Sequence, residues 1–226
     1  MNRGIVIASV LAAAAALATL SMRGEAASAT TTPANQWRPG LNYTVLAYPL
    51  PSTLPKGKVE VNEVFWYGCS HCFALDPVLE SWKASKPAYV EFVRIPVIWG
   101  PSHRQHARLF YTLQKLGRDD LHPKVFAAIH QGGKTLMAST DQEARAMHLS
   151  FLKENGVSEK QFNDAYDSPE VAKQLDLAQD LTGRYEVASV PTMIVAGSYS
   201  TSVSQAGGET QLLALINDLA AREQRR

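Results

Sequence analysis

The sequence has little cysteine, no excess of charge of either sign, and no long apolar run beyond its N-terminus. Its 226 residues include only two cysteines, Cys69 and Cys72. A disulfide between residues so close in sequence closes almost no loop and adds little stability, so we expect the pair to serve chemistry. The 22 basic and 21 acidic residues give a net charge of +1 with no basic stripe. Composition therefore offers no argument for a nucleic-acid partner.

The N-terminus has the layout of a secretory signal peptide. Arg3 precedes an uncharged run from Gly4 to Met22, and small residues follow at 27–29 (Ala-Ser-Ala). This predicts a signal peptide over 1–29 and export of the remainder. A retained membrane anchor is the alternative, because the run is near the lower limit for spanning a bilayer, at about 17 to 20 residues. Alanine dominates the run and inserts weakly into membranes, which favours cleavage.

The next patterns predict a strand, a helix and a second strand. Residues 58–66 alternate and then become continuously apolar, as in a strand buried on both faces. A helical stripe follows over 73–82, and 90–97 has the pattern of another strand. Such a unit pairs its strands in parallel through a right-handed crossover. It places both cysteines at the N-terminus of the crossover helix.

The rest of the chain divides into a long helical stretch and a short return to strands. Residues 102–181 have helical periodicity throughout, which is too much helix for one crossover and predicts a helical domain inserted into a smaller α/β domain. Strand patterns return at 192–196 and near 199–203, and an amphipathic helix spans about 209–221. A short edge strand is expected at 43–47.

The strongest chemical signal is Cys69-Ser70-His71-Cys72, between the first strand and the helix. A structural zinc site would need two further ligands, and the sequence has no other cysteine and no suitable histidine pair. We therefore expect no metal. A loop of this length also makes a purely structural disulfide a poor explanation.

The two cysteines are expected to differ in acidity. Cys69 would sit at the helix N-terminus, where free backbone N–H groups and the helix dipole favour a thiolate, and His71 would add positive charge or a hydrogen-bond donor. Stabilising the reduced form makes a disulfide a stronger oxidant, so the sequence favours disulfide donation. Cys72, one turn further into the helix, would be buried, keep a higher pKa, and resolve mixed disulfides formed at Cys69.

A resemblance to a known family becomes specific at this point. The aromatic-rich segment Phe65-Trp66-Tyr67-Gly68, the cysteine motif, a helical insertion and then Val190-Pro191-Thr192 together resemble the DsbA family of bacterial periplasmic thiol oxidases over essentially the whole mature chain. The resemblance implies an α/β, thioredoxin-like fold with an inserted α-helical domain. The expected boundaries are a lead-in and edge strand at 30–46, a thioredoxin-like domain at 47–100 and 182–226, and the helical insertion at 101–181.

The resemblance also assigns further site residues. It implies a cis proline at Pro191 lying against the disulfide, with the backbone of Val190 free to pair with an extended substrate peptide. Glu63 matches an acidic residue beneath the active site, where burial would raise its pKa and let it exchange protons with Cys72. Arg94 stands near the position where some members carry a lysine that partners this acid. Ser70 departs from the family's usual proline and leaves the oxidising strength open.

The sequence thus predicts a periplasmic thiol:disulfide oxidoreductase that donates its Cys69–Cys72 disulfide to exported proteins with free cysteines. By resemblance, a DsbB-like membrane oxidase would reoxidise it. We expect a monomer with no bound cofactor. A periplasmic reductase or isomerase would share every residue named so far and differ only in redox poise. A peptide-binding, chaperone-like protein with incidental cysteines is the alternative from another class.

Overall fold

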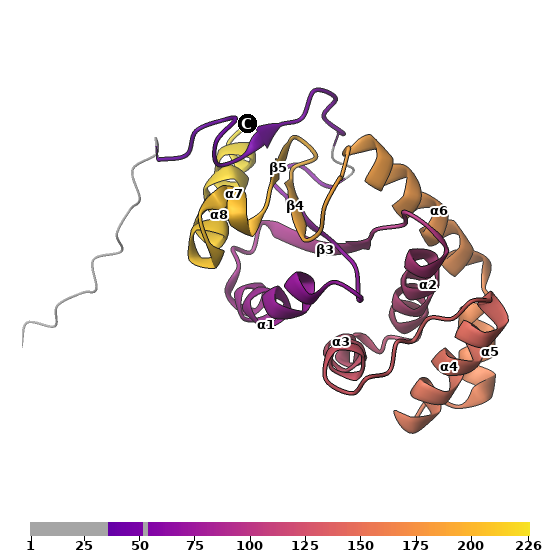
Figure 1. Ribbon diagram of the computed structural model, residues 1–226. Helices are drawn as coiled ribbons and strands as arrows, with labels where there is room; N and C mark the ends of the chain where they lie inside the picture. Colours follow the sequence, from indigo (N-terminus) through magenta and orange to yellow (C-terminus); the bar gives the residue numbers. More distant parts are fainter. Residues whose placement is uncertain (1–35, 52–53) are drawn as a thin grey trace, which may run out of the picture. The chain divides into compact units, whose positions relative to one another are not determined.

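The structure is a computed structural model that describes residues 36–51 and 54–226, so the signal peptide predicted over 1–29 lies outside it. The described part is built on a five-stranded sheet in the order β1-β5-β4-β2-β3 (Figure 1). Strands β2 and β3 are parallel, and the other neighbouring pairs are antiparallel. The strands are β1 (Thr44–Val45), β2 (Val59–Phe65), β3 (Val90–Pro96), β4 (Thr192–Val195) and β5 (Tyr199–Thr201).

Strand β2 lies between β3 and β4 and ends just before the cysteines. Its near-continuous apolar sequence fits this central place, because a strand covered on both faces buries successive side chains. Helix α1 (Ser70–Ser85) then joins β2 to the parallel β3, which confirms the predicted strand-helix-strand unit. In this register Glu63 of β2 lies opposite Arg94 of β3.

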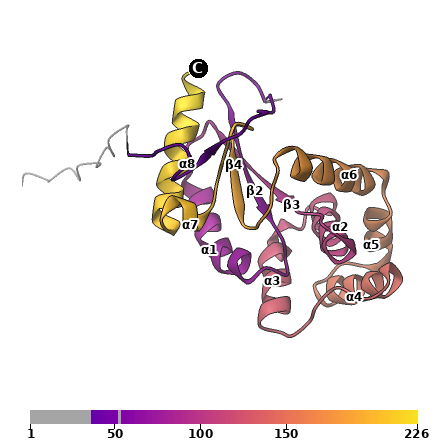
Figure 2. The same cartoon turned by 45° about the horizontal axis from the view of Figure 1, so that its top comes forward.

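One face of the sheet is covered by α1 and by α8 (Glu209–Gln224), as Figure 2 shows. Their apolar stripes pack on odd-numbered side chains of β2 and β4, such as Val61 and Met193. The indole N–H of Trp82 in α1 donates to Asn217 Oδ1 of α8 at 3.0 Å. This packing fixes the position of α1, and therefore of the cysteines at its start.

The helical stretch lies next to β3, the strand at one edge of the sheet. It contains α2 (Pro101–Lys115), the 3₁₀ helix η1 (Asp119–Leu121), α3 (His122–His130), α4 (Asp141–Glu154), α5 (Glu159–Tyr166) and α6 (Pro169–Arg184). Helices α2 and α6 contact β3. A single apolar cluster joins sheet residues such as Val64 and Ile95 to helical residues such as Leu109 and Leu175. This continuous core fixes the helical stretch against the sheet.

Local sequence explains where several of these helices begin. Thr140 caps α4, and Ser158 caps α5, each through a capping box that pairs the cap residue with the third residue of the helix. Ser168 caps α6 and is followed by Pro169 at the first helical position, where proline is well tolerated. These signals satisfy backbone N–H groups that would otherwise lack a partner.

Two predicted boundaries differ from the observed elements. The strand expected near 199–203 ends at Thr201, because the Ser202 hydroxyl accepts from the backbone of Gln205 and starts the short helix α7 (Val203–Ala206). The boundary expected between 181 and 182 falls inside α6. The described residues belong to one compact unit, and the division into two domains stays a prediction. Within residues 36–51 and 54–226, no helix is long and apolar enough to cross a membrane.

Candidate active site around the cysteine pair

Cys69 occupies the N-cap of α1 and is half-exposed, while both cysteines are free thiols. Cys69 makes no side-chain capping hydrogen bond, and its backbone has the extended conformation usual at an N-cap. The first turn of α1 contains no acidic residue. A thiolate at Cys69 is therefore an anion at the positive end of a helix, without a competing carboxylate in that turn.

The pKa of Cys69 is lowered from 9.0 to about 5. The largest cause is a hydrogen bond from the Cys72 side chain, and burial opposes it. Backbone N–H groups of Cys72 and His71 and the charge of His71 lower the pKa further. His71 itself is exposed. At neutral pH Cys69 is thus predominantly a thiolate, the form that takes part in thiol:disulfide exchange.

Cys72 has the opposite surroundings. Its side chain is fully buried, and its pKa is raised above the usual thiol range by the hydrogen bond to Cys69 and by burial. The negative charge of Glu63 raises it further. Cys72 therefore stays a thiol at neutral pH and needs a proton acceptor before it can attack a disulfide.

Glu63 supplies a titratable group beneath the pair, and its predicted burial is confirmed at 1% exposure. Burial raises its pKa from 4.5 to about 7, against the lowering effect of Arg94. Its Oε2 accepts from Arg94 Nε at 2.8 Å, while its buried Oε1 has no hydrogen-bond partner among the described residues. A carboxyl with one free oxygen and a pKa near 7 can both take up and release a proton at neutral pH.

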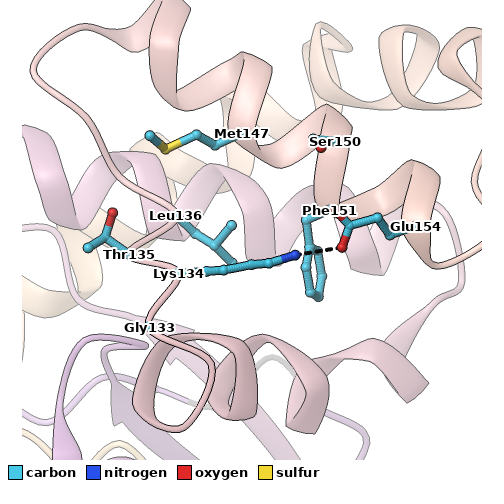
Figure 3. Close-up of a pocket in the computed structure, with 8 residues that line it drawn as sticks. All are labelled: Gly133, Lys134, Thr135, Leu136, Met147, Ser150, Phe151 and Glu154. Atoms are coloured by element: carbon cyan, nitrogen blue, oxygen red, sulfur yellow. Dashed lines mark hydrogen bonds and ion pairs between the residues drawn. The ribbon is translucent and has the colours of Figure 1, made fainter.

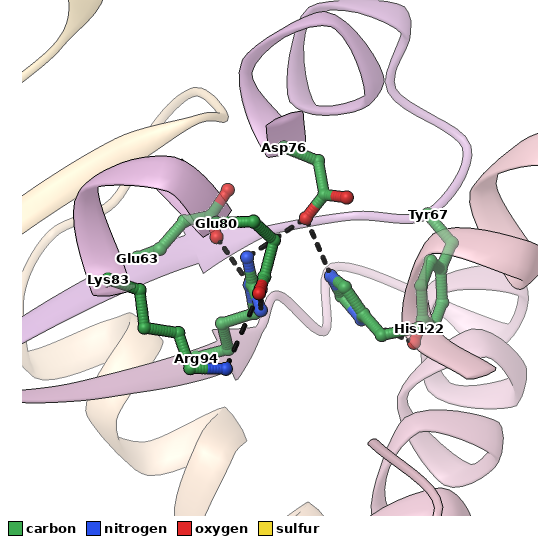
Figure 4. Close-up of polar contacts among 7 residues, drawn as sticks. All are labelled: Glu63, Tyr67, Asp76, Glu80, Lys83, Arg94 and His122. Atoms are coloured by element: carbon green, nitrogen blue, oxygen red, sulfur yellow. Dashed lines mark hydrogen bonds and ion pairs between the residues drawn. The ribbon is translucent and has the colours of Figure 1, made fainter. Parts of the chain in front are cut away.

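Arg94 is the centre of a buried charge cluster (Figure 4). Besides Glu63, its guanidinium donates to Asp76 Oδ1 at 2.9 Å and to Glu80 Oε1 at 2.7 Å. Asp76 is buried, whereas Glu80 is partly exposed and also lies 3.6 Å from Lys83. One cation thus faces three carboxylates, and the charges of Asp76 and Glu80 add a smaller upward effect to that of burial on the pKa of Glu63.

Helix α3 of the helical stretch holds the loop before Cys69. The Tyr67 hydroxyl and His122 Nδ1 are 2.7 Å apart, and His130 Nε2 donates to the carbonyl oxygen of Tyr67 at 2.8 Å. His122 Nε2 lies 3.3 Å from Asp76 Oδ1, which links this loop to the charge cluster. The His130 ring also stacks on Phe73 in the first turn of α1, with centroids 4.8 Å apart. The insertion therefore positions both sides of the cysteine motif.

The loop from Val190 to Thr192 meets the cysteines from the other side. The Val190–Pro191 peptide bond is cis, as the resemblance implies. Cys69 Sγ lies 3.5 Å from the carbonyl oxygen of Val190. Val190 is half-exposed, so a polypeptide bonded to Cys69 would lie beside its backbone.

The structure therefore brings all six predicted site residues, Glu63, Cys69, His71, Cys72, Val190 and Pro191, to one region, with Glu63 below it in the core. Sequence reasoning missed Asp76, Glu80 and His122. Asp76 and Glu80 follow Cys72 at spacings of four residues, which places all three on one side of α1 and was a usable signal. His122 comes from the insertion, and no local pattern connects it to the cysteines.

Two other observations bear on what the site could hold. Among the described residues, no group of three or more His, Cys, Asp or Glu side chains is placed to bind a metal ion. A hollow of about 330 Å³ on the helical stretch is lined by the loop after α3 and by α4, and the Lys134–Glu154 ion pair crosses it at 2.6 Å (Figure 3). Neither cysteine lines it. The dithiol site is thus distinct from this hollow.

A half-exposed thiolate followed by a buried thiol defines a thiol:disulfide oxidoreductase, and the sheet that carries the pair is of the thioredoxin type. Comparison with known proteins agrees. The chain is 38% identical over 210 residues to the thiol:disulfide interchange protein DsbA of Pseudomonas aeruginosa, covering 92% of this chain and 94% of that protein. It is 36% identical over 177 residues to DsbA of Bordetella pertussis, covering 78% and 81%. The chain belongs to the DsbA family.

Comparison with solved structures also finds DsbA proteins. The crystal structure of Pseudomonas aeruginosa DsbA matches with a TM-score of 0.77 at 36% identity, covering 84% of this chain and 95% of that one. DsbA of Xylella fastidiosa matches with a TM-score of 0.73 at 26% identity, covering 81% and 96%. No protein-family model matches the chain. The predicted thioredoxin-like fold and the thiol:disulfide oxidoreductase activity are therefore confirmed.

Proposed function

We propose that this protein donates the Cys69–Cys72 disulfide to exported proteins with free cysteines during oxidative folding. The observation that carries the proposal is the placement of half-exposed Cys69 at the N-cap of α1, one turn before buried Cys72, which goes with a pKa of Cys69 lowered to about 5. A stabilised thiolate favours the reduced enzyme, so the corresponding disulfide is readily given up to a substrate dithiol. The names of the relatives, thiol:disulfide interchange proteins, support thiol:disulfide exchange as the reaction.

The reaction consists of two exchanges. A substrate thiolate attacks Cys69 Sγ of the disulfide, which forms a mixed disulfide and releases Cys72 as a thiolate that takes up a proton. A second substrate thiolate then attacks the substrate sulfur of the mixed disulfide and releases Cys69 as a thiolate. The substrate loses two electrons and two protons as its disulfide forms. The enzyme disulfide gains the two electrons, one proton ends on Cys72, and the other passes to solvent because Cys69 leaves as a thiolate.

Each predicted site residue has a role in this scheme. Cys69 forms the mixed disulfide, because it is the half-exposed sulfur and the better leaving group. His71 supports its thiolate by charge and by its backbone N–H. Glu63 accepts or returns the proton of buried Cys72 through its free oxygen.

The remaining predicted residues would bind the substrate. The backbone of Val190, next to the cis Pro191 and 3.5 Å from Cys69 Sγ, would pair with an extended substrate segment as an added strand. Such backbone pairing does not depend on the side chains of the substrate.

The cellular setting follows from the N-terminal sequence. The signal peptide at 1–29 would direct the protein to the periplasm and be removed there, where disulfides form and persist. The reduced enzyme needs an electron acceptor after each turnover, and a DsbB-like membrane oxidase would serve. We propose that the protein acts as a monomer without a metal or bound cofactor.

The test is the redox equilibrium of the purified protein with glutathione buffers, followed by trapping of free thiols at Cys69 and Cys72. We expect the pair to stay reduced until the buffer is strongly oxidising. A pair that is oxidised even in strongly reducing buffer would indicate a reductase. A Cys69→Ala, Cys72→Ala variant with full activity would indicate a peptide-binding chaperone. A Ser70→Pro variant measured beside the wild type would show how much serine in this motif changes the equilibrium.

A further inference from the structure

We propose that an aromatic pocket beside Cys69 binds an apolar or aromatic side chain of the substrate polypeptide, close in sequence to the cysteine that is being oxidised. We call it the Trp66 pocket and define it by Trp66, Trp99, His103 and Met137. This inference rests on the proposed function and names a feature of the substrate that the cysteine pair alone does not select.

The pocket is a built feature with defined walls. It has a volume of about 350 Å³ and is completed by Gly100, Pro101 and Ser102 at the start of α2. The His103 ring lies against Trp66 with centroids 4.5 Å apart and meets Trp99 edge-on at 5.4 Å. Trp99 is 46% exposed, so a large apolar side chain remains open to solvent at the mouth.

The pocket is linked to Cys69 through the backbone turn that begins at Trp66. The carbonyl oxygen of Trp66 accepts from the backbone N–H of Cys69 at 3.0 Å. The Trp66 ring folds over the backbone at Gly68, where an added Cβ would lie only 2.4 Å from the ring. Glycine at this position therefore lets the wall of the pocket reach the residue next to Cys69. A polypeptide bonded to Cys69 would then start close to this wall.

The chemistry of the walls indicates the occupant. None of the residues that line the pocket is Asp, Glu, Lys or Arg. Burial lowers the pKa of His103, so the imidazole is neutral at pH 7. Indole rings and a thioether bind apolar and aromatic side chains and offer no counter-charge to an acidic one. The continuity with Cys69 makes the occupant part of the disulfide-receiving chain rather than a free small molecule.

Peptides that share a cysteine pair and differ at one neighbouring residue test the inference. The residue is Trp, Gly or Asp, placed in turn before and after the first cysteine, and the rate of oxidation by the oxidised protein is measured by stopped flow. We expect the Trp peptide, in one of the two placements, to react about tenfold faster than the Gly peptide, the scale of filling one apolar pocket. We expect the Asp peptide to gain nothing.

Two variants change the pocket in opposite ways. Trp99→Ala removes a wall, and Ser102→Phe fills the space, so each should bring the ratio of the Trp and Gly rates close to one. Leu177→Ala is the matched control, because Leu177 lies on α6 outside the pocket and has a similar exposed fraction, 45%. It should keep the wild-type ratio.

The outcomes separate this inference from the proposed function. Equal rates for Trp and Gly peptides with the wild type, or an unchanged ratio in both variants, would overturn the pocket assignment and leave disulfide donation intact. Failure of the oxidised wild type to oxidise any of the peptides would overturn the proposed function itself.

Discussion

The surface of the active site and its interior are built from different chemistry. Around half-exposed Cys69 lie Trp66, the backbone of Val190 and His71, whose charge lowers the pKa of Cys69. Around buried Cys72 and Glu63 lie Arg94 and further carboxylates. The contrast indicates a division of labour. The surface presents a thiolate, aromatic rings and backbone groups to the substrate, while the interior retains the charges needed to move a proton to and from the second cysteine.

The largest effect should come from substituting each of the two cysteines in turn. Cys69→Ala should abolish disulfide transfer, because no accessible sulfur remains. Cys72→Ala should instead form mixed disulfides at Cys69 that persist, because the resolving thiol is gone. Non-reducing electrophoresis after incubation with a thiol-containing substrate distinguishes the two. Equal accumulation of mixed disulfides in both variants would contradict the assignment of surface and interior sulfur.

Breaking the interior charge cluster should be the next largest effect. Arg94→Met removes the cation shared by Glu63, Asp76 and Glu80, and we expect the free energy of unfolding to fall by about 3 to 5 kcal/mol, since buried carboxylates lose their partner. Urea denaturation measures it. Lys58→Met is the control, because it breaks an exposed pair with Glu91 and should leave stability nearly unchanged. Similar losses in both variants would contradict the account.

Substituting Glu63, the proposed proton acceptor, should slow thiol:disulfide exchange while both cysteines remain in place. Glu63→Gln should slow reoxidation of the reduced protein by oxidised glutathione at least about tenfold at pH 7, because attack by Cys72 requires loss of its proton. The pH–rate profile should also lose its inflection near pH 7. Glu60→Gln is the control, because Glu60 lies on the same strand and faces the opposite side of the sheet. A wild-type profile in the Glu63 variant would contradict the proposed relay.

A smaller effect should appear in stability as a function of pH. Folding lowers the pKa of Cys69 to about 5, so between pH 5 and 9 the unfolded reduced chain binds a proton that the folded chain does not. Unfolding free energy of the reduced form should therefore rise with pH across this window. The raised pKa of Glu63, about 7, acts in the opposite direction from pH 4.5 to 7, but it acts in both redox forms. The unfolding free energy of the reduced form minus that of the oxidised form, both measured by urea denaturation, should thus increase from pH 5 to 9.

The strand-helix-strand unit could be predicted from sequence because its signals are local. Alternation and apolar runs define β2 and β3, and the cysteine motif lies where β2 must end and α1 begin. The apolar neighbours of Glu63 in the sequence also predicted its burial. The end of β5 could have been predicted as well, since Ser202 followed three residues later by Gln205 is a capping signal that the alternating pattern concealed.

The rest of the site depends on contacts between distant segments. His122 and His130 reach the cysteine loop only because α3 packs beside α1. Trp99 and Met137, in separate loops, meet at Trp66 to form the pocket. No periodicity or motif in the sequence predicts these contacts, because they are determined by tertiary packing rather than by local conformational preference.

The most direct test of the account is the acidity of Cys69, since the contrast between surface and interior rests on it. The rate of alkylation of the reduced protein by iodoacetamide, measured as a function of pH, reports the fraction of Cys69 thiolate. We predict a midpoint near pH 5, and a higher midpoint in Cys72→Ala than in Cys72→Ser, because serine retains a hydrogen-bond donor. A midpoint near pH 9, unaffected by either substitution, would contradict the central claim that the two cysteines are made unequal.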